Sequence, residues 1–109
     1  MRQFNPGQLR HTIQIQASSE SQDPMIGENI PTWNTIATRR AFVRPKSGKE
    51  VLQATQQHAE VTHLVTMRYL KNITSKNRLI YNGRDFEIVF VIDVEERKRW
   101  LELLCIERP

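Results

Sequence analysis

The segment His58–Tyr69, which reads HAEVTHLVTMRY, decides the fold class of this chain. From Val61 onward, β-branched and apolar residues alternate along it. One parity holds Val61, His63, Val65, Met67 and Tyr69, and the other holds Thr62, Leu64, Thr66 and Arg68. A period of two with many β-branched residues is typical of a β-strand. We therefore predict a strand here, with His63 on its apolar face.

The two histidines of this segment have the wrong spacing for a metal site. A helical zinc-protease motif needs two histidines four apart, with a glutamate directly after the first. Here His63 is the fifth residue after His58, and Glu60 is the second. Five residues turn the second ring away from the first on a helix, and an odd separation puts the rings on opposite faces of a strand. We interpret His63 as a hydrogen-bonded, half-buried histidine, and we expect no metal and no other cofactor.

Further strands are predicted on both sides of this segment. Asn82-Gly83 is the strongest hairpin signal, because both residues tolerate the positive φ of a type I′ turn. Pro45 should end an extended segment, because proline cannot donate to a ladder. The predicted strands are Arg10–Ala17, Trp33–Arg44, Arg78–Tyr81, Arg84–Val94 and Arg99–Glu107.

Two of these strands have informative side-chain patterns. In Arg84–Val94 one parity holds Phe86, Ile88, Phe90, Ile92 and Val94, which predicts that all five face the core. In the last strand Leu101, Leu103 and Cys105 share one face, and Trp100, Leu104 and Ile106 share the other. Because both faces are apolar there, we expect another element or a partner subunit to cover one of them.

The chain has 109 residues, the size of one domain spanning residues 1–109. Closely spaced strands with short turns predict an all-β fold: a small antiparallel β-barrel or sandwich of about six strands, with one short helix and a long mobile loop. No apolar run is long enough for a transmembrane helix, and the first residues do not resemble a secretory signal. Cys105 is the only cysteine and reads as a core residue. We expect a cytoplasmic product without membrane contact.

The charge distribution and the motifs bear on function. The net charge is +4, but the basic residues are dispersed, which favours a solvated surface over a dedicated DNA-reading face. The four glycines are isolated, so there is no phosphate-binding loop, and no arrangement of nucleophile and base is visible. We expect that the protein is not an enzyme.

Two segments are less regular. Residues 47–57, SGKEVLQATQQ, predict a short helix that Ser47 and Glu50 cap and that packs through Val51, Leu52 and Ala54. Residues 18–32, SSESQDPMIGENIPT, hold two prolines, three acids and no basic residue, which predicts an exposed, mobile loop.

Five features follow one another along the chain in this order: LRHTIQIQ (9–16), the tryptophan at 33, VRPKSGKEVLQATQQHAEVTHLVTMRY (43–69), YNGRDFEI (81–88) and LELLCIE (101–107). Together they resemble the phage head–tail joining family, the head-closure or connector adaptor proteins of long-tailed phages, prophages and gene transfer agents. The resemblance extends from about Leu9 to Glu107.

This resemblance implies a small β-barrel in the virion neck, made in the bacterial host cytoplasm. Members assemble into a ring, usually dodecameric, under the portal and its adaptor protein. The ring continues the channel for double-stranded DNA, retains the genome without reading its sequence, and docks a tail-terminator-type protein. The isolated subunit is expected to be a monomer.

The resemblance also implies that residues 45–58 lie toward the channel and help to close it. We expect this gate segment to rearrange on assembly, with Lys46 and Lys49 near DNA phosphate and Gln53, Gln56 and Gln57 pairing between subunits. The alternative is a fixed surface helix packed on the barrel through Val51, Leu52 and Ala54.

The loop 18–32 has two interpretations as well. It is either a docking arm that orders against a neighbouring ring, with Glu20, Asp23, Met25 and Glu28 as contacts, or an ordinary disordered loop. For the whole protein, the alternative to a connector subunit is a small-barrel nucleic-acid-binding module. A metal hydrolase is a third alternative, which the histidine spacing argues against.

Overall fold

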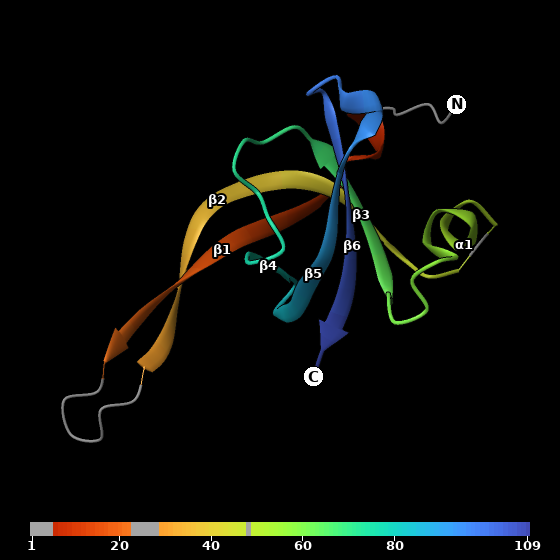
Figure 1. Ribbon diagram of the computed structural model, residues 1–109. Helices are drawn as coiled ribbons and strands as arrows, with labels where there is room; N and C mark the ends of the chain where they lie inside the picture. The colour runs from red at the N-terminus through yellow and green to blue at the C-terminus, as the bar shows by residue number, and fades with distance from the viewer. Residues whose placement is uncertain (1–5, 23–28, 48) are drawn as a thin grey trace.

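The computed structural model describes residues 6–22, 29–47 and 49–109 as a closed antiparallel barrel of six strands in the order β1-β2-β3-β6-β5-β4 (Figure 1). The strands are β1 (His11–Gln22), β2 (Asn29–Pro45), β3 (His63–Arg68), β4 (Arg78–Tyr81), β5 (Arg84–Asp93) and β6 (Trp100–Arg108). The helices are η1 (Pro6–Gln8), α1 (Lys49–Thr55) and η2 (Val94–Glu96). The predicted all-β barrel with one short α-helix is confirmed.

The barrel interior is the main hydrophobic core. Every strand contributes to it through its inward-facing side chains, which alternate along each strand as the pleat requires except at a register shift. Its fully buried members include Ile13, Ile15, Ala41, Val65, Met67, Leu79, Phe86, Ile88, Leu103 and Cys105. Burial raises the pKa of the Cys105 thiol to about 12, so this cysteine is an inert core residue, as predicted.

β3 and β6 lie at the centre of a second, smaller core on the outside of the barrel. Leu64 of β3 and Leu104 of β6 point outward and pack with Val51 of α1 and with Val61. The second apolar face of the last strand is therefore covered in part by another element, namely α1. The expected packing stripe of the helix is wrong at Leu52, which is 49% exposed, and the side chain of Ala54 lies outside the described residues.

The predicted inward face of β5 is wrong in its second half. The register against β6 shifts between Ile88 and Phe90, which marks a β-bulge. The extra residue inverts the alternation, so Phe90 and Ile92 turn to solvent and Val91 packs against the core. Their exposed fractions are 48% for Phe90 and 39% for Ile92.

The prediction of a loop over residues 18–32 is wrong in its extent. β1 continues to Gln22 and β2 begins at Asn29, and the two strands pair residue by residue from Ser18↔Trp33 to Gln22↔Asn29. They form a two-stranded arm that projects beyond the barrel (Figure 1). Pairing between the two strands satisfies one edge of each, so polar residues without a hydrophobic face still form strands here.

The turn at Asn82-Gly83 is the predicted hairpin, with φ of 54° and 75° at the two residues. We expect Gly83→Ala to lower the free energy of unfolding by about 1 kcal/mol, because alanine is strained at this φ. A Cβ there would meet nothing within 4 Å, so the cost should come from the backbone alone. Urea unfolding measures it, with Asn82→Gly as the control that keeps stability within about 0.5 kcal/mol. An unchanged Gly83→Ala stability would contradict the turn geometry.

Candidate functional site

The predicted gate segment leaves β2 at Pro45, forms α1 and returns to β3. Val51 is its buried anchor, 3% exposed. Thr55 is fully buried one turn later, and its hydroxyl donates to the Val51 carbonyl (2.8 Å). The His58 N–H then donates to the Thr55 carbonyl (2.9 Å), which ends the helix. The segment is thus held to the barrel by one apolar contact site and local hydrogen bonds.

Lys46 makes hydrogen bonds that join the two ends of this segment. Its backbone N–H donates to the Thr62 carbonyl (2.8 Å), and its ammonium group donates to the carbonyls of His58 (3.3 Å) and Ala59 (3.4 Å). The two ends of the gate segment are therefore tied together. The expected role of Lys46 at DNA phosphate stays a prediction, and it requires these bonds to open.

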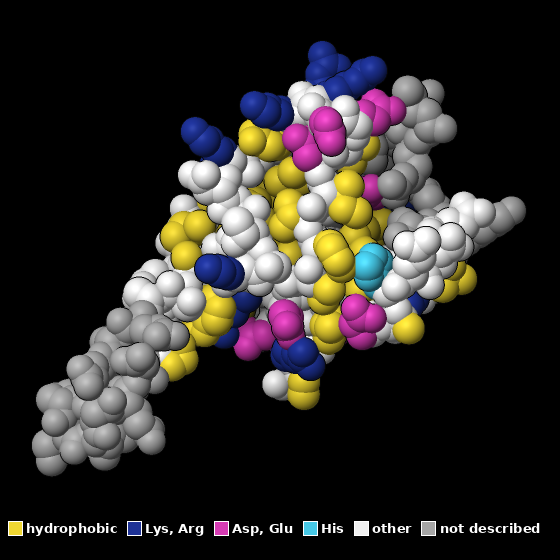
Figure 2. Space-filling model, viewed as in Figure 1, with side chains coloured by type: hydrophobic (Ala, Val, Ile, Leu, Met, Phe, Trp, Pro, Cys, Tyr) yellow, Lys and Arg dark blue, Asp and Glu magenta, His cyan; other side chains and the backbone are white. Residues whose placement is uncertain are grey.

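The other predicted gate residues lie on the solvent side. Gln53, Gln56 and Gln57 are exposed, so all three are accessible to a neighbouring subunit. The side chain of Lys49 lies outside the described residues. The ring of His58 packs on Phe90 of β5 at 4.5 Å between centroids. Figure 2 shows hydrophobic side chains exposed over the face of the barrel turned to the viewer.

His63 lies in a polar cluster with Arg84 and Glu107. Its Nδ1 is 2.9 Å from the Thr62 hydroxyl, and its ring meets the buried Phe86 edge to face. Arg84 donates to both oxygens of Glu107 (2.8 and 2.7 Å), and its Nη2 lies 3.4 Å from His63 Nε2. The predicted half-buried, hydrogen-bonded histidine is confirmed. Within residues 6–22, 29–47 and 49–109, no three His, Cys, Asp or Glu side chains gather as a metal site.

We expect the free energy of unfolding to fall in two steps on acidification. Burial holds the pKa of folded His63 below 6.5, so the unfolded chain takes up its proton first, and stability falls as the pH drops below that value. The hydrogen bond from Arg84 lowers the pKa of Glu107 below 4.5, so its contribution is lost when the pH falls through the lowered value.

Urea unfolding between pH 8 and pH 3 measures both steps. His63→Gln should remove the first step and keep the second. Glu107→Gln should remove the second. A first step that persists in His63→Gln would show that another group causes it.

The predicted docking residues fall in or near the arm. Glu20 lies in β1, although its side chain is not among those described, and Asp23, Met25 and Glu28 lie outside the described residues. A row of polar and charged side chains on its outer face joins the arm to the barrel. Arg78 lies over the Trp33 ring at 4.3 Å, and its Nε donates to Gln16 (2.7 Å).

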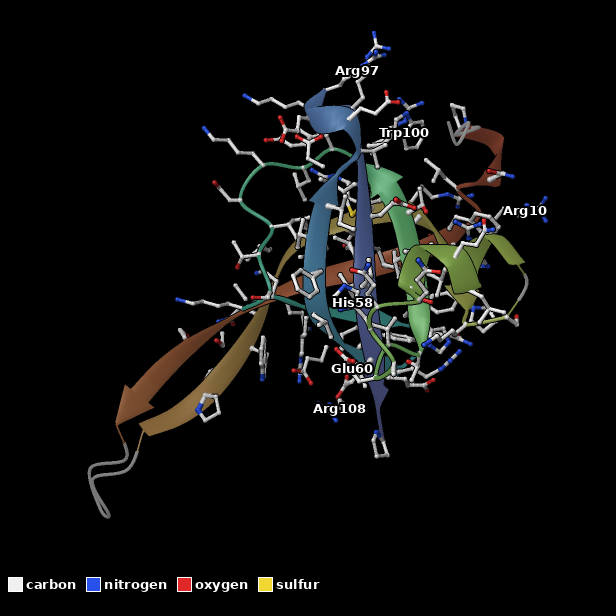
Figure 3. All side chains as sticks on the ribbon, turned by 45° about the vertical axis from the view of Figure 1, so that its right-hand side comes forward. Arg10, His58, Glu60, Arg97, Trp100 and Arg108 are labelled. Atoms are coloured by element: carbon white, nitrogen blue, oxygen red, sulfur yellow. The ribbon has the colours of Figure 1, made fainter. Side chains whose placement is uncertain are left out.

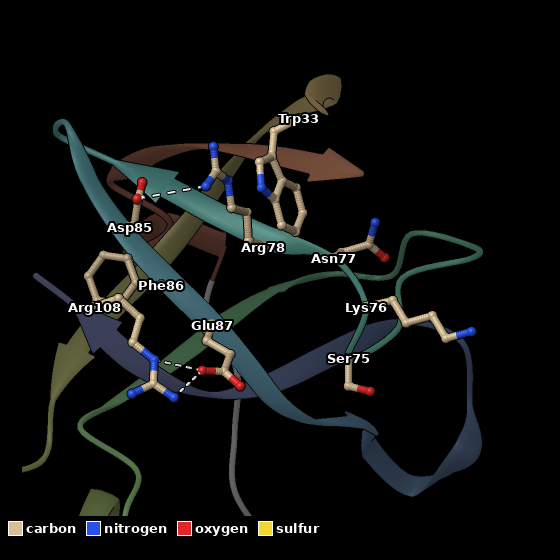
Figure 4. A pocket seen from close by; sticks show the side chains of 9 residues that line it. All are labelled: Trp33, Ser75, Lys76, Asn77, Arg78, Asp85, Phe86, Glu87 and Arg108. Atoms are coloured by element: carbon tan, nitrogen blue, oxygen red, sulfur yellow. Dashed lines mark hydrogen bonds and ion pairs between the residues drawn. The ribbon is translucent and has the colours of Figure 1, made fainter. Parts of the chain in front are cut away.

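This row of side chains continues across the barrel and lines a pocket of about 360 Å³ at the base of the arm (Figure 4). Arg78 also approaches Asp85 (3.8 Å), and Arg108 donates to Glu87 Oε2 through Nε (2.7 Å) and Nη2. This row could not be predicted from the sequence, because only the closure of the barrel brings β2, β4, β5 and β6 together. Its charges are paired with each other, so it reads as a brace that orients the arm.

The opposite end of the barrel is basic. Arg68, Lys98 and Arg99 line an open depression of about 480 Å³ together with Tyr69 and Trp100. Arg68 lies over the Trp100 ring at 5.3 Å, and Figure 3 shows Trp100 beside the projecting Arg97. The neighbouring turn also carries acids: Glu95 pairs with Arg97 (3.4 Å), and Asp93 accepts the Lys98 N–H (3.1 Å).

None of the described helices is long and apolar enough to span a bilayer. The model of the phage head completion protein family matches residues 4–108. The head completion protein gp7 of Enterobacteria phage HK97 is 27% identical over 107 residues, covering 94% of this chain and 95% of gp7.

Two solved structures are similar as well. A Shigella flexneri 2a protein solved in solution has a TM-score of 0.72 and 31% identity, covering 95% of this chain and 96% of that one. A chain in the virion of a native gene transfer agent particle has a TM-score of 0.60 and 14% identity, covering 91% and 94%, and this likeness concerns the fold alone.

Proposed function

Because the chain belongs to the phage head completion protein family, we propose that it is a structural subunit of the virion neck that forms a ring between the portal with its adaptor and the tail. The observation that carries this proposal is the family match over residues 4–108, which covers the barrel, the gate segment and the arm. The chain acts by assembly and not by catalysis.

In this proposal the ring is dodecameric and continues the channel for double-stranded DNA. It completes the head, retains the packaged genome and presents a docking surface to a tail-terminator-type protein. Contacts to DNA are made to the phosphate backbone and are independent of sequence.

The gate segment, residues 45–58, supplies the closing element. A gate needs two arrangements of similar energy, so that assembly can select one. The packing of α1 supports this role: Val51 is the one apolar anchor among the described side chains of this seven-residue helix, with the buried Thr55 bonded to it and Lys46 joining the ends of the segment. Release would free the ammonium group of Lys46 for DNA and bring Gln53, Gln56 and Gln57 to a neighbouring subunit.

The arm supplies the docking element. It projects from the barrel and is braced at its base by Arg78 and Trp33, so it reaches a neighbour in a defined direction. Glu20, Asp23, Met25 and Glu28 are the proposed contacts. The acidic character of three of them favours a basic surface on the adjoining neck protein.

Mixing the protein with its cognate portal–adaptor complex tests the proposal. Negative-stain microscopy should show an added ring coaxial with the portal, and mass measurement should give its number of subunits. A portal complex that gains no density and no mass would contradict the connector role.

The basic depression beside Trp100 favours a second candidate, a nucleic-acid-binding module, because cations next to aromatic rings suit phosphates and bases. The two functions differ in the behaviour of the free subunit. A module binds free DNA with an affinity that falls steeply with salt, whereas a connector subunit binds it weakly before assembly. Titration of fluorescent duplex and single-stranded DNA at two salt concentrations separates them.

A further inference from the structure

The basic depression and the gate segment lie on the same outer face of the barrel. β3 pairs with β6 there, and Leu64 stands opposite Leu104, where both point outward and pack with α1. Arg68 stands opposite Trp100, four residues further along each strand. The second pair therefore has the same parity and also points outward, roughly 14 Å away at ~3.4 Å per residue. Figure 3 shows Trp100 at the opposite end of the barrel from Glu60, which follows the gate segment.

The depression presents cations and aromatic rings, and no acid lines it. Its lining residues are Arg68, Tyr69, Lys98, Arg99 and Trp100, and the three basic side chains are exposed. Arginine, lysine and tyrosine side chains are frequent donors to the phosphate oxygens of DNA. The lining therefore matches a phosphate backbone in charge and in hydrogen-bonding groups.

Arg40 extends this basic surface onto β2. β2 pairs with β3 from Ala41↔Met67 onward, and the same register one step earlier puts Arg40 level with Arg68. Both side chains are exposed, and Arg40 Nε donates to the Leu9 carbonyl (3.1 Å). Like charges at one level of neighbouring strands destabilise a sheet, and an anion between them removes this cost. The surface therefore favours a polyanion over a neutral ligand.

The turn that supplies Lys98 and Arg99 has an unusual backbone. Glu95, Glu96 and Lys98 have φ of 56°, 53° and 55°, in the left-handed region. This region costs energy for residues other than glycine, and such residues are concentrated at ligand-binding sites. The Tyr69 N–H donates to the Arg99 carbonyl (2.9 Å), which fixes the turn beside the end of β3. The fold thus keeps a strained turn that holds two cations at the depression.

The acids near the depression are not part of its lining. Glu95 pairs with Arg97 (3.4 Å), and Asp93 accepts the backbone N–H of Lys98 (3.1 Å). Glu102 has the outward parity on β6, but it is 1% exposed and is not presented to a ligand. The surface that a ligand meets is therefore basic.

From these observations we infer that the depression, together with Arg40, binds the phosphate backbone of the duplex DNA that passes through the ring. The inference rests on the proposed function: a ring that turns the gate segment to the channel also turns the depression to it, because both lie on one face. The cations stand on three neighbouring strands and span roughly 10 Å, which matches about three phosphates along one DNA strand.

The inferred contact depends on assembly. Each subunit offers the four cations Arg40, Arg68, Lys98 and Arg99, so a free subunit binds duplex DNA weakly, with an affinity that falls as salt rises. In a ring the copies hold the same DNA together, and each contact raises the effective concentration for the next.

Photo-cross-linking in DNA-filled heads tests the inference. Lys98→Cys puts a thiol at an exposed position of the depression, where a photoreactive maleimide modifies it. Cys105 is buried, with the pKa of its thiol raised to about 12, and stays unmodified. Lys76→Cys is the matched control, because it removes the same charge at an exposed position just before β4, which lies opposite β3 in the strand order of the barrel. Arg99→Cys is a second labelled position, used if the label at 98 prevents assembly.

The labelled variants are added to DNA-filled heads that carry portal and adaptor but lack this subunit, and microscopy verifies the ring. After irradiation, Lys98→Cys should give about tenfold more DNA adduct than Lys76→Cys, because only the depression contacts the duplex. Adding Arg40→Gln and Arg68→Gln to Lys98→Cys should lower this yield about threefold or more, because two phosphate contacts are lost.

An intact ring that gives equal adduct yields from Lys98→Cys and Lys76→Cys, or no adduct from Lys98→Cys, would overturn the inference and leave the proposed function standing. Heads that gain no ring from the unlabelled protein would overturn both. A free labelled subunit that cross-links to free duplex DNA at physiological salt as well as the ring does would also overturn the inference, in favour of the nucleic-acid-binding module.

Discussion

Replacing Val51 with aspartate should release α1 from the barrel while the barrel itself stays folded. Val51 is 3% exposed and is the residue through which α1 enters the outer core with Val61, Leu64 and Leu104. A carboxylate at this position loses its hydration without a partner of opposite charge, which costs several kcal/mol. A helix of seven residues has no stability of its own to compensate.

Amide hydrogen exchange measures this release. If the free energy of local opening falls by about 3 kcal/mol, exchange across Lys49–Thr55 accelerates about 100-fold. The amides of β5 around Phe86 and Ile88 should keep their protection, because these two side chains pack in the other core. A change spread evenly over all strands would show that Val51 supports the whole barrel.

Leu52→Asp is the matched control, because it makes a similar change in charge and size on the same helix. Leu52 is 49% exposed, so an aspartate there remains hydrated, and exchange should change less than threefold. Equal acceleration in both variants would mean that helix propensity, and not the contact of Val51, holds the segment.

The same measurement separates the two interpretations of the gate segment. The gate hypothesis requires the protection of residues 49–55 to differ between the free subunit and the assembled ring, because assembly selects a second arrangement. A fixed surface helix keeps its protection in both states. Val51→Asp then serves as the reference for a released segment.

The strands could be predicted wherever local chemistry determines them. The alternation around His63, the end of β2 at Pro45 and the hairpin at Asn82-Gly83 all depend on neighbouring residues, and the structure has each of them. Pairing of the arm was not predictable in this way. Its β1 residues are polar and rich in serine, and they form a strand because each lies opposite a partner on β2.

The polar clusters were not predictable, since their members are distant in sequence. Arg84 and Glu107 are 23 residues apart, and Arg78 meets Gln16 across 62 residues. Only the closure of the barrel brings them together, and the amino-acid composition does not indicate which strands become neighbours. The outer core was half predictable: the apolar second face of the last strand indicated a cover, but not that Val51 rather than Leu52 provides it.

The bulge in β5 gives the clearest test of what alternation alone misses. Phe86 and Phe90 have the same parity, so a regular strand would bury both equally. The register shift after Ile88 leaves Phe86 1% exposed in the core and Phe90 48% exposed. The same substitution at the two positions should therefore have very different costs.

Phe86→Ala should lower the free energy of unfolding by about 3–5 kcal/mol, through lost burial and the cavity left behind. In a domain of this size such a loss lowers the melting temperature by roughly 15 °C or more. Phe90→Ala should cost about 1 kcal/mol or less, because half of its ring already meets water and its main described ring contact is His58. Thermal unfolding followed by circular dichroism compares the two directly. Equal losses would mean that β5 runs without a bulge and that both rings lie in the core. A large loss at Phe86 alone places the inversion of the side-chain alternation between the two residues. The one extra residue there turns the second half of β5 into surface available to a partner.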